Sequence, residues 1–154
     1  MVLGTAMLPH PAWSEVPKTA RPKLYDESLD GSKQIADALN IAKKEHKRVL
    51  LQFGANWCGW CHLLHNLFEA DKAINESLKA NYVVVLIDVN EGHNKDVDAR
   101  YGNPIRFGLP VIVILASDGK QLTTKNTEEL EQGKQHDPAK VLAFLKEWAP
   151  KQSQ

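Results

Sequence analysis

The segment that decides the fold is Val49–His62, which reads VLLQFGANWCGWCH and contains both cysteines of the chain. Its first five residues form an apolar run interrupted only by Gln52, which is typical of a β-strand covered on both faces. A turn follows, and from Gly59 onward apolar residues recur at helical spacing. The sequence therefore predicts a strand, a turn and a helix, with Cys58 and Cys61 where the turn meets the helix.

Length and charge limit the kinds of partner. The chain has 154 residues, enough for one domain with a sizeable core and too few for two typical domains. Its 19 basic and 19 acidic residues balance, so no net field would attract nucleic acid or an anionic membrane surface. No stretch approaches the roughly 18 apolar residues that a membrane-spanning helix needs. We therefore expect a monomer with protein or peptide partners, no nucleic acid and no membrane span.

Residues 1–30 show no sustained periodicity and hold four of the eight prolines, so we expect an extended arm there. The arm is either a flexible leader or a segment docked on the fold through Trp13 and Tyr25. Its apolar start leaves open whether it is the remnant of a cropped export signal. We expect the folded domain at residues 31–150 and a short tail at residues 151–154.

Helices and strands alternate along the rest of the chain. A first helix should begin at Ser32 as the N-cap, with Asp30 as the rival cap, and the helix after Gly59 should break near Ala70–Lys72. The other expected elements are a strand at 82–89, a short helix at 94–101, a strand at 111–115, a turn at 117–120, a strand at 121–125, a solvated loop at 126–136 and a last helix at 138–150. This order predicts an α/β fold, with a central mixed sheet flanked by helices on both faces.

Two cysteines three residues apart allow three chemistries. The stretch Cys58–His62 matches the C-x-x-C-H pattern of covalent haem attachment, but the iron also needs an axial ligand and small haem domains of this kind are largely helical. A zinc site could use Cys58, Cys61, His62 and His65. However, four ligands along one helix span about 10 Å, which does not fit tetrahedral bonds of about 2.0 to 2.3 Å. We favour the third chemistry, a redox-active dithiol.

The dithiol hypothesis uses every neighbouring feature. At a helix N-terminus, Cys58 receives unpaired backbone N–H groups and the positive end of the helix dipole, which stabilise its thiolate and lower its pKa below the free value of about 8.5. Cys58 then attacks a substrate disulfide, and the less exposed Cys61 resolves the mixed disulfide. Gly59 permits a tight turn and close approach of a partner's backbone. The redox group is the cysteine pair itself, so we expect no bound cofactor.

On these residues, the chain from about Ser32 to Pro150 resembles the thioredoxin-fold proteins. Trp57–Cys61 resembles their W-C-G-x-C active site, Gly108–Pro110 resembles the loop that carries their cis-proline, and Asp118-Gly119 resembles the turn of their terminal hairpin. Within the superfamily, the chain is most similar to the single-domain thioredoxin-like disulfide reductases, which are typically exported in bacteria.

The resemblance implies roles for individual residues. Cys58 matches the nucleophile and Cys61 the resolving thiol, and the residues that match the substrate surface are Trp57, Gly59, Trp60, Leu109 and Pro110. Leu109 would offer its backbone to a bound peptide, and the Leu109–Pro110 peptide bond would be cis.

The implied function is a thiol-disulfide oxidoreductase, leaning toward reductase or isomerase, that acts on protein thiols and disulfides with a redox partner protein. The implied location is the periplasm or another exported compartment, with the cytoplasm as the alternative. A different class of function also fits, a peptide-binding or chaperone-like module with incidental redox activity.

Three positions depart from thioredoxin. Gln52 stands where thioredoxins keep a buried acid, and Leu86 stands where they keep the lysine paired with it, so the group that takes the proton from Cys61 is open. His62 is a candidate because imidazole titrates near neutral pH, although adjacent helical side chains point about 100° apart. Trp60 replaces a proline, and the absence of a histidine between the cysteines favours the reductase direction.

Overall fold

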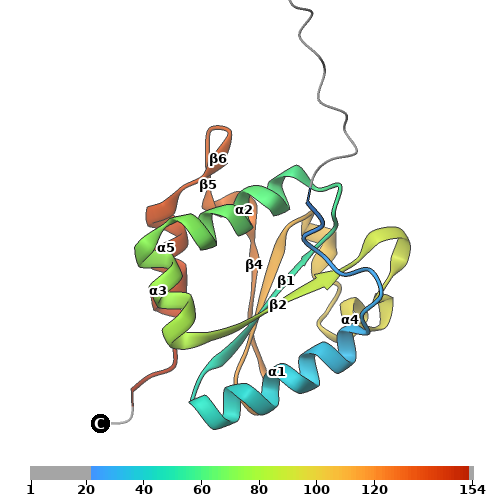
Figure 1. Cartoon of the computed structure of the whole chain (residues 1–154), viewed down its shortest axis with the longest axis horizontal. Helices are drawn as coiled ribbons and strands as arrows, with labels where there is room; N and C mark the ends of the chain where they lie inside the picture. The colour runs from blue at the N-terminus through green and yellow to red at the C-terminus, as the bar shows by residue number, and fades with distance from the viewer. Residues whose placement is uncertain (1–21, 153–154) are drawn as a thin grey trace, which may run out of the picture.

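A four-stranded sheet lies at the centre of residues 22–152, the part of the chain that the computed structural model describes (Figure 1). Its strands are β1 (Arg48–Gly54), β2 (Tyr82–Asp88), β3 (Val111–Leu115) and β4 (Gln121–Asn126). The strand order is β2-β1-β3-β4. Because β1 pairs with β2 in parallel and with β3 antiparallel, the sheet is mixed, as the sequence predicts.

Helices cover both faces of this sheet and bury two apolar cores (Figure 1). One face carries α1 (Gly31–Glu45) and α4 (Lys95–Arg100), and the other carries α2 (Gly59–Ala70), α3 (Lys72–Asn81) and α5 (Pro138–Glu147). Successive side chains of a strand point to opposite faces. Leu51 of β1 accordingly packs in the core under α1, while Leu50 packs in the core under α2. The predicted α/β arrangement is confirmed.

The first helix begins two residues earlier than the preferred cap indicates, at the rival cap Asp30. The Asp30 carboxylate accepts the N–H of Lys33 at 2.9 Å, so Asp30 is the N-cap and the expectation that Ser32 caps this helix is wrong. Asp and Ser cap helices about equally well, so the local sequence could not choose between them. A tertiary contact fixes the start, because the side-chain oxygen of Asn94 accepts the N–H of Gly31 at 2.8 Å.

The long second helix breaks where the sequence indicates. Asp71 ends α2 and caps α3, with its carboxylate accepting the N–H of Ile74 at 3.0 Å. The predicted break near Ala70–Lys72 is therefore confirmed, and α2 and α3 are free to cross the sheet in different directions. Within residues 22–152, short 3₁₀ turns also join the larger elements, namely η2 (Asn90–Gly92), η3 (Pro104–Phe107) and η4 (Thr127–Leu130).

The segment 126–136, expected as a solvated loop, is folded back against the domain. After η4 it forms a small hairpin of β5 (Glu131–Gln132) and β6 (Gln135–His136). Leu130 and His136 are each only 3% exposed, so the loop prediction is wrong here. Strands of two residues are too short to show a period of two, and the burial comes from tertiary packing that a local pattern cannot reveal.

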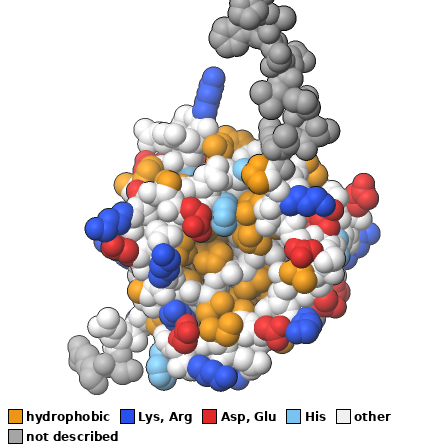
Figure 2. Space-filling view, viewed as in Figure 1, with side chains coloured by type: hydrophobic (Ala, Val, Ile, Leu, Met, Phe, Trp, Pro, Cys, Tyr) orange, Lys and Arg blue, Asp and Glu red, His pale blue; other side chains and the backbone are white. Residues whose placement is uncertain are grey.

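The edge of the sheet formed by β2 carries apolar surface. Figure 2 shows hydrophobic side chains gathered in the middle of one face of the molecule, over this strand. Val84 of β2 and Ile41 of α1 are among the exposed large hydrophobic residues, and both line a hollow beside the edge. No helix within residues 22–152 is long and apolar enough to cross a membrane.

Candidate active site

Cys58 and Cys61 form a disulfide at the point where the turn after β1 becomes α2. Cys58 is the N-cap of α2, and its sulfur accepts the backbone N–H of Cys61 at 3.2 Å. Cys58 is 5% exposed and Cys61 is fully buried. The N-terminus of α2 therefore directs at the outer sulfur a backbone N–H that has no partner within the helix. This arrangement stabilises a thiolate on Cys58 once the disulfide is reduced.

Three residues beside the disulfide present surface to solvent. The Trp57 side chain is 64% exposed, and its indole N–H donates to the side-chain oxygen of Asn90 at 3.0 Å. Gly59 is exposed as the first residue of α2, and Trp60 is half-buried. The Trp60 ring meets the ring of His136 edge-on, with centroids 5.2 Å apart. The small hairpin β5–β6 therefore supports one side of the site.

The loop before β3 reaches the disulfide from another part of the chain. The peptide bond between Leu109 and Pro110 is cis, Pro110 is buried, and its carbonyl accepts a hydrogen bond from the Thr127 hydroxyl. Leu109 is half-buried and packs against the cluster that contains Cys58 and Cys61. The structure thus brings Leu109, with the adjoining Pro110, to the cluster of the two cysteines.

An open hollow of about 460 Å³ lies beside the first turns of α2, the helix that begins at the disulfide. It is lined by Gly59, Trp60, His62, Leu63 and Lys134, so α2 supplies one wall and the β5–β6 hairpin supplies the other. Sequence reasoning missed Lys134 because it placed this residue in a solvated loop. The hollow gives an approaching chain room beside Gly59 and Trp60, the two residues between the cysteines.

The ring of His62, the candidate for proton transfer, is hydrogen-bonded to the backbone. Its Nε2 lies 2.8 Å from the backbone carbonyl of Asn56. A carbonyl only accepts, so Nε2 carries the proton in this contact and Nδ1 is the free acceptor of the neutral ring. No hydrogen bond among the described residues links His62 to Cys61, and its role in proton transfer stays a prediction.

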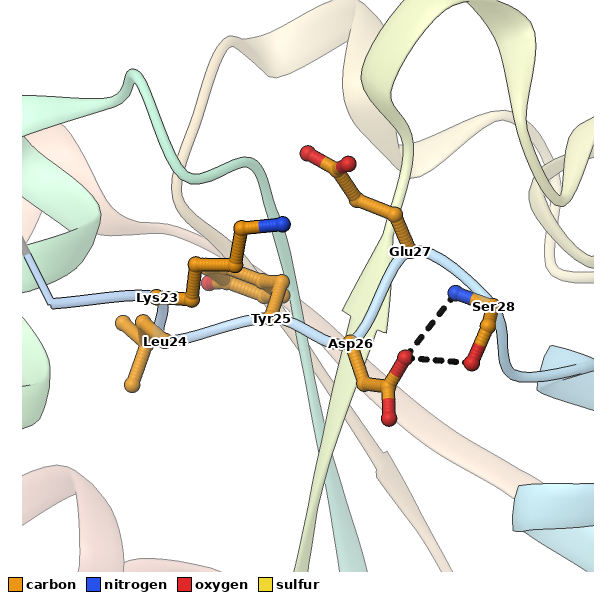
Figure 3. Close-up of a pocket in the computed structure, with 6 residues that line it drawn as sticks. All are labelled: Lys23, Leu24, Tyr25, Asp26, Glu27 and Ser28. Carbon is orange, nitrogen blue, oxygen red and sulfur yellow. Dashed lines mark hydrogen bonds between the residues drawn. The ribbon is translucent and has the colours of Figure 1, made fainter. Parts of the chain in front are cut away.

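The residue behind the disulfide that sequence reasoning undervalued is Tyr25. It is 1% exposed and packs with Cys58 and Cys61 in one buried cluster. Figure 3 shows the segment around it, where Asp26 accepts two hydrogen bonds from Ser28. These bonds, with the side-chain hydroxyl contributing most, lower the pKa of the Asp26 carboxyl. Of the two side chains expected to dock an arm, Tyr25 docks, and Trp13 lies outside the described residues.

Asn56 holds the Tyr25 segment in place. Its side-chain oxygen accepts the N–H groups of Leu24 and Tyr25, each at 2.8 Å, and its NH₂ donates to the Tyr25 carbonyl at 2.9 Å. The NH₂ group also reaches the Glu27 carboxylate at 3.2 Å. An asparagine in the turn just before the first cysteine was the available signal, because a short amide side chain there can bond the backbone of a second segment.

The positions that depart from thioredoxin lie side by side. Gln52 of β1 and Leu86 of β2 are partners in the parallel register, and Gln52 is fully buried. Its NH₂ group donates to the Tyr25 hydroxyl at 2.8 Å and to the Cys61 carbonyl at 3.3 Å. A neutral amide therefore connects the buried cysteine to the buried tyrosine.

The two sulfurs are bonded to each other, and no group of three or more His, Cys, Asp or Glu side chains within residues 22–152 could hold a metal ion. His62, the histidine of the haem pattern, is bonded to the Asn56 carbonyl through Nε2. The arrangement suits exchange between the cysteine pair and a thiol or disulfide of another molecule.

Comparisons with known proteins agree on the fold of this chain. A family model described as a thioredoxin-like domain matches residues 35–132. The solved structure of a disulphide isomerase from Xylella fastidiosa Temecula1 is 33% identical, with a TM-score of 0.74, and the match covers 83% of this chain and 98% of that one. A thioredoxin from Thermus thermophilus shares the fold with a TM-score of 0.54 at 21% identity, covering 73% of this chain and 81% of that one.

Curated relatives match over a shorter stretch. A protein disulfide-isomerase from Medicago sativa is 33% identical over 79 residues, which is 51% of this chain and 15% of the relative. A thiol:disulfide interchange protein from Campylobacter jejuni is 30% identical over 76 residues, which is 49% of this chain and 13% of the relative. The chain thus spans only a small part of these relatives. The predicted thioredoxin-like fold is confirmed, and the predicted class of activity is supported.

Proposed function

The chain belongs to the thioredoxin-like family, and from this premise we propose that it is a thiol-disulfide oxidoreductase that acts on protein substrates. The observation that carries the proposal is the Cys58–Cys61 disulfide at the N-terminus of α2, with Leu109 packed beside it. The names of its relatives, which include disulfide isomerases, support the same class of reaction.

In the proposed reaction, the reduced Cys58 thiolate attacks a substrate disulfide. A bond forms between Cys58 and one substrate sulfur, while the other substrate sulfur leaves as a thiolate and takes up a proton. Cys61 then attacks the Cys58 sulfur, which closes the Cys58–Cys61 disulfide and releases the substrate as a dithiol. Cys58 suits the first step because it is the outer thiol, and buried Cys61 suits the second because only Cys58 is within its reach.

The proposed substrate surface consists of residues around the outer sulfur, namely Trp57, Gly59, Trp60, Leu109 and Pro110. Exposed aromatic surface at Trp57 and the hollow beside Trp60 would receive apolar side chains of a bound segment. The backbone of Leu109 would pair with that segment as an added strand. The partners are therefore protein or peptide thiols and disulfides, with a second redox protein to restore the starting state.

The proposal also covers the direction of thiol-disulfide exchange and the compartment of the protein. We place the protein as a reductase or isomerase, with no cofactor beyond the cysteine pair, in the periplasm or another exported compartment. The partner that reduces or oxidises it would be a separate protein. Cell fractionation and the reduction potential of the Cys58–Cys61 pair against glutathione test these two points directly.

Insulin reduction by dithiothreitol tests the activity. We expect the protein with both cysteines to accelerate insulin precipitation, and Cys58→Ser to lose that acceleration because no thiolate remains to attack. The exposed substitution Asn66→Ala on α2 serves as a control and should leave the rate unchanged. Equal rates for the protein and Cys58→Ser would exclude the oxidoreductase proposal and leave the peptide-binding module as the better account.

A further inference from the structure

The resolving step of the proposed function poses a problem at Cys61. This thiol must become a thiolate although it is fully buried, and burial disfavours the charged form. Gln52 and Leu86 supply no charge to help it, since one is a neutral amide and the other is apolar. Neither of these sheet positions therefore supplies a charge that would stabilise the Cys61 thiolate.

Tyr25 brings a polar group toward this sulfur from outside the sheet. Both the Tyr25 hydroxyl and the Cys61 sulfur lie under 3.0 Å from the point where a Cβ of Gly54 would stand. Only a glycine leaves that space open, so the end of β1 is shaped to let the hydroxyl approach the sulfur. The Tyr25 ring packs in the same buried cluster as both cysteines.

Gln52 determines how the hydroxyl can bond. Its NH₂ group also donates to the Cys61 carbonyl, which can only accept, so the orientation of the amide is fixed and the Tyr25 oxygen receives a hydrogen bond from it. The hydroxyl proton is then free to donate. In the disulfide form, no described residue accepts that proton in a hydrogen bond, and reduction creates a new acceptor beside it, the Cys61 sulfur.

Burial keeps this tyrosine protonated. It raises the pKa of the Tyr25 hydroxyl well above its ordinary value, although the hydrogen bond from Gln52 lowers that pKa, and the negative charge of Asp88 adds a smaller increase. Asp88 is 1% exposed, and one of its oxygens accepts from His93 at 2.8 Å. Tyr25 is thus a donor of a hydrogen bond rather than a base.

The other titratable groups near Cys61 lie on its own helix. They are Cys58, His62 and His65, and His62 is turned to the Asn56 carbonyl. Asp88 is the last residue of β2 and pairs with Gly54 of β1, and His93 follows it in the next loop.

We propose that the Tyr25 hydroxyl, oriented by Gln52, donates a hydrogen bond to the Cys61 sulfur and stabilises its thiolate in the resolving step. The thiolate then attacks the Cys58 sulfur of the mixed disulfide. The Cys58–Cys61 bond forms, the bond between Cys58 and the substrate breaks, and the substrate sulfur leaves with the electron pair. The proton lost by Cys61 is balanced by the proton that the departing substrate thiolate takes from solvent, and Tyr25 keeps its own proton.

Titration of Cys61 in a Cys58→Ser background tests this inference without requiring activity. Cys61 is then the only thiol of the chain, and carbon-13 NMR of its labelled Cβ reports its ionisation. Tyr25→Phe keeps the ring and removes the hydroxyl. We expect it to raise the pKa of Cys61 by about one unit, roughly a tenfold loss of thiolate at a given pH, as for one hydrogen bond to a charged group.

Tyr82→Phe is the matched control. It also removes a buried hydroxyl, one that donates to the Leu145 carbonyl at 2.7 Å, but Tyr82 packs in the core under α2, α3 and α5 and not in the cysteine cluster. We expect the pKa of Cys61 to stay unchanged in this variant. An equal shift in both variants would mean a general loosening of the fold and would overturn the role of Tyr25.

The inference rests on the proposed function, but the experiments can disprove either one without the other. With both cysteines present, Tyr25→Phe should move the acid limb of the insulin-reduction pH profile to higher pH by the same amount as the titration. An unchanged Cys61 titration would remove Tyr25 from the resolving step even if the protein reduces insulin. If the titration shifts as expected and the protein does not reduce insulin, the hydrogen bond stands and the proposed function falls.

Discussion

At the scale of single residues, Gly54 shows how one absent side chain shapes the site. It ends β1 and pairs with Asp88 across the parallel ladder, so its backbone position is fixed by the sheet. Its open side is occupied by the Tyr25 hydroxyl and the Cys61 sulfur. The requirement for glycine here is a requirement for space and comes from groups distant in sequence.

Gly54→Ala should therefore disturb both neighbours. The new methyl group would overlap the tyrosine ring and the sulfur, neither of which is the end of a flexible side chain, and we expect a loss of roughly 1 to 3 kcal/mol in the free energy of unfolding. Urea denaturation measures it. In a Tyr25→Phe background the cost should shrink, since the overlapping hydroxyl is gone, and strictly additive costs would contradict the overlap.

Individual residues also show how much of the site could be predicted from the sequence. The placement of Cys58 and Cys61 could be predicted because the cue is local, an apolar strand followed by a helical period. Tyr25 and Asn56 could not be joined in advance, because their contact links segments 31 residues apart through hydrogen bonds that carry no periodic pattern. The sequence shows that Gln52 stands where thioredoxins keep a buried acid, but it does not show that Gln52 bonds the Tyr25 hydroxyl.

At the scale of elements, the same division appears. The break at Asp71 and the mixed sheet were predictable, since caps and apolar runs are local signals. The β5–β6 hairpin was not, since its strands are short and His136 packs against Trp60, which is distant in sequence. That burial lowers the pKa of His136, which keeps its ring neutral against the indole.

Another prediction concerns the segment 22–30 as an element. Asn56→Ala removes the side chain that bonds the backbone of Leu24 and Tyr25, and we expect a loss of roughly 2 to 3 kcal/mol in the free energy of unfolding. Hydrogen exchange at the Leu24 and Tyr25 amides should become much faster. Asn66→Ala, which removes an exposed asparagine without a hydrogen bond among the described residues, should change neither quantity.

At the scale of the whole molecule, two buried tyrosines tie distant segments to the sheet. Tyr25 anchors the segment 22–30 beside the cysteines, and Tyr82 at the start of β2 bonds the carbonyl of Leu145 in α5. Burial is the main cause that raises the pKa of each hydroxyl above the ordinary value of 10.0, with the charge of Arg48 opposing it at Tyr82. Both anchors are therefore neutral in the folded protein at pH values where an unfolded chain would ionise them.

This difference predicts how stability depends on alkaline pH. Because the folded-state pKa lies above the unfolded one, the stabilisation is fully present below pH 10 and is lost as pH rises above it. We expect each tyrosine to cost roughly 1 kcal/mol of unfolding free energy per pH unit there, once solvent screening is allowed for. Thermal denaturation across this range should show a slope that is shallower in Tyr25→Phe and in Tyr82→Phe, and shallowest in the double variant. A slope unaffected by either substitution would mean that other groups govern alkaline unfolding.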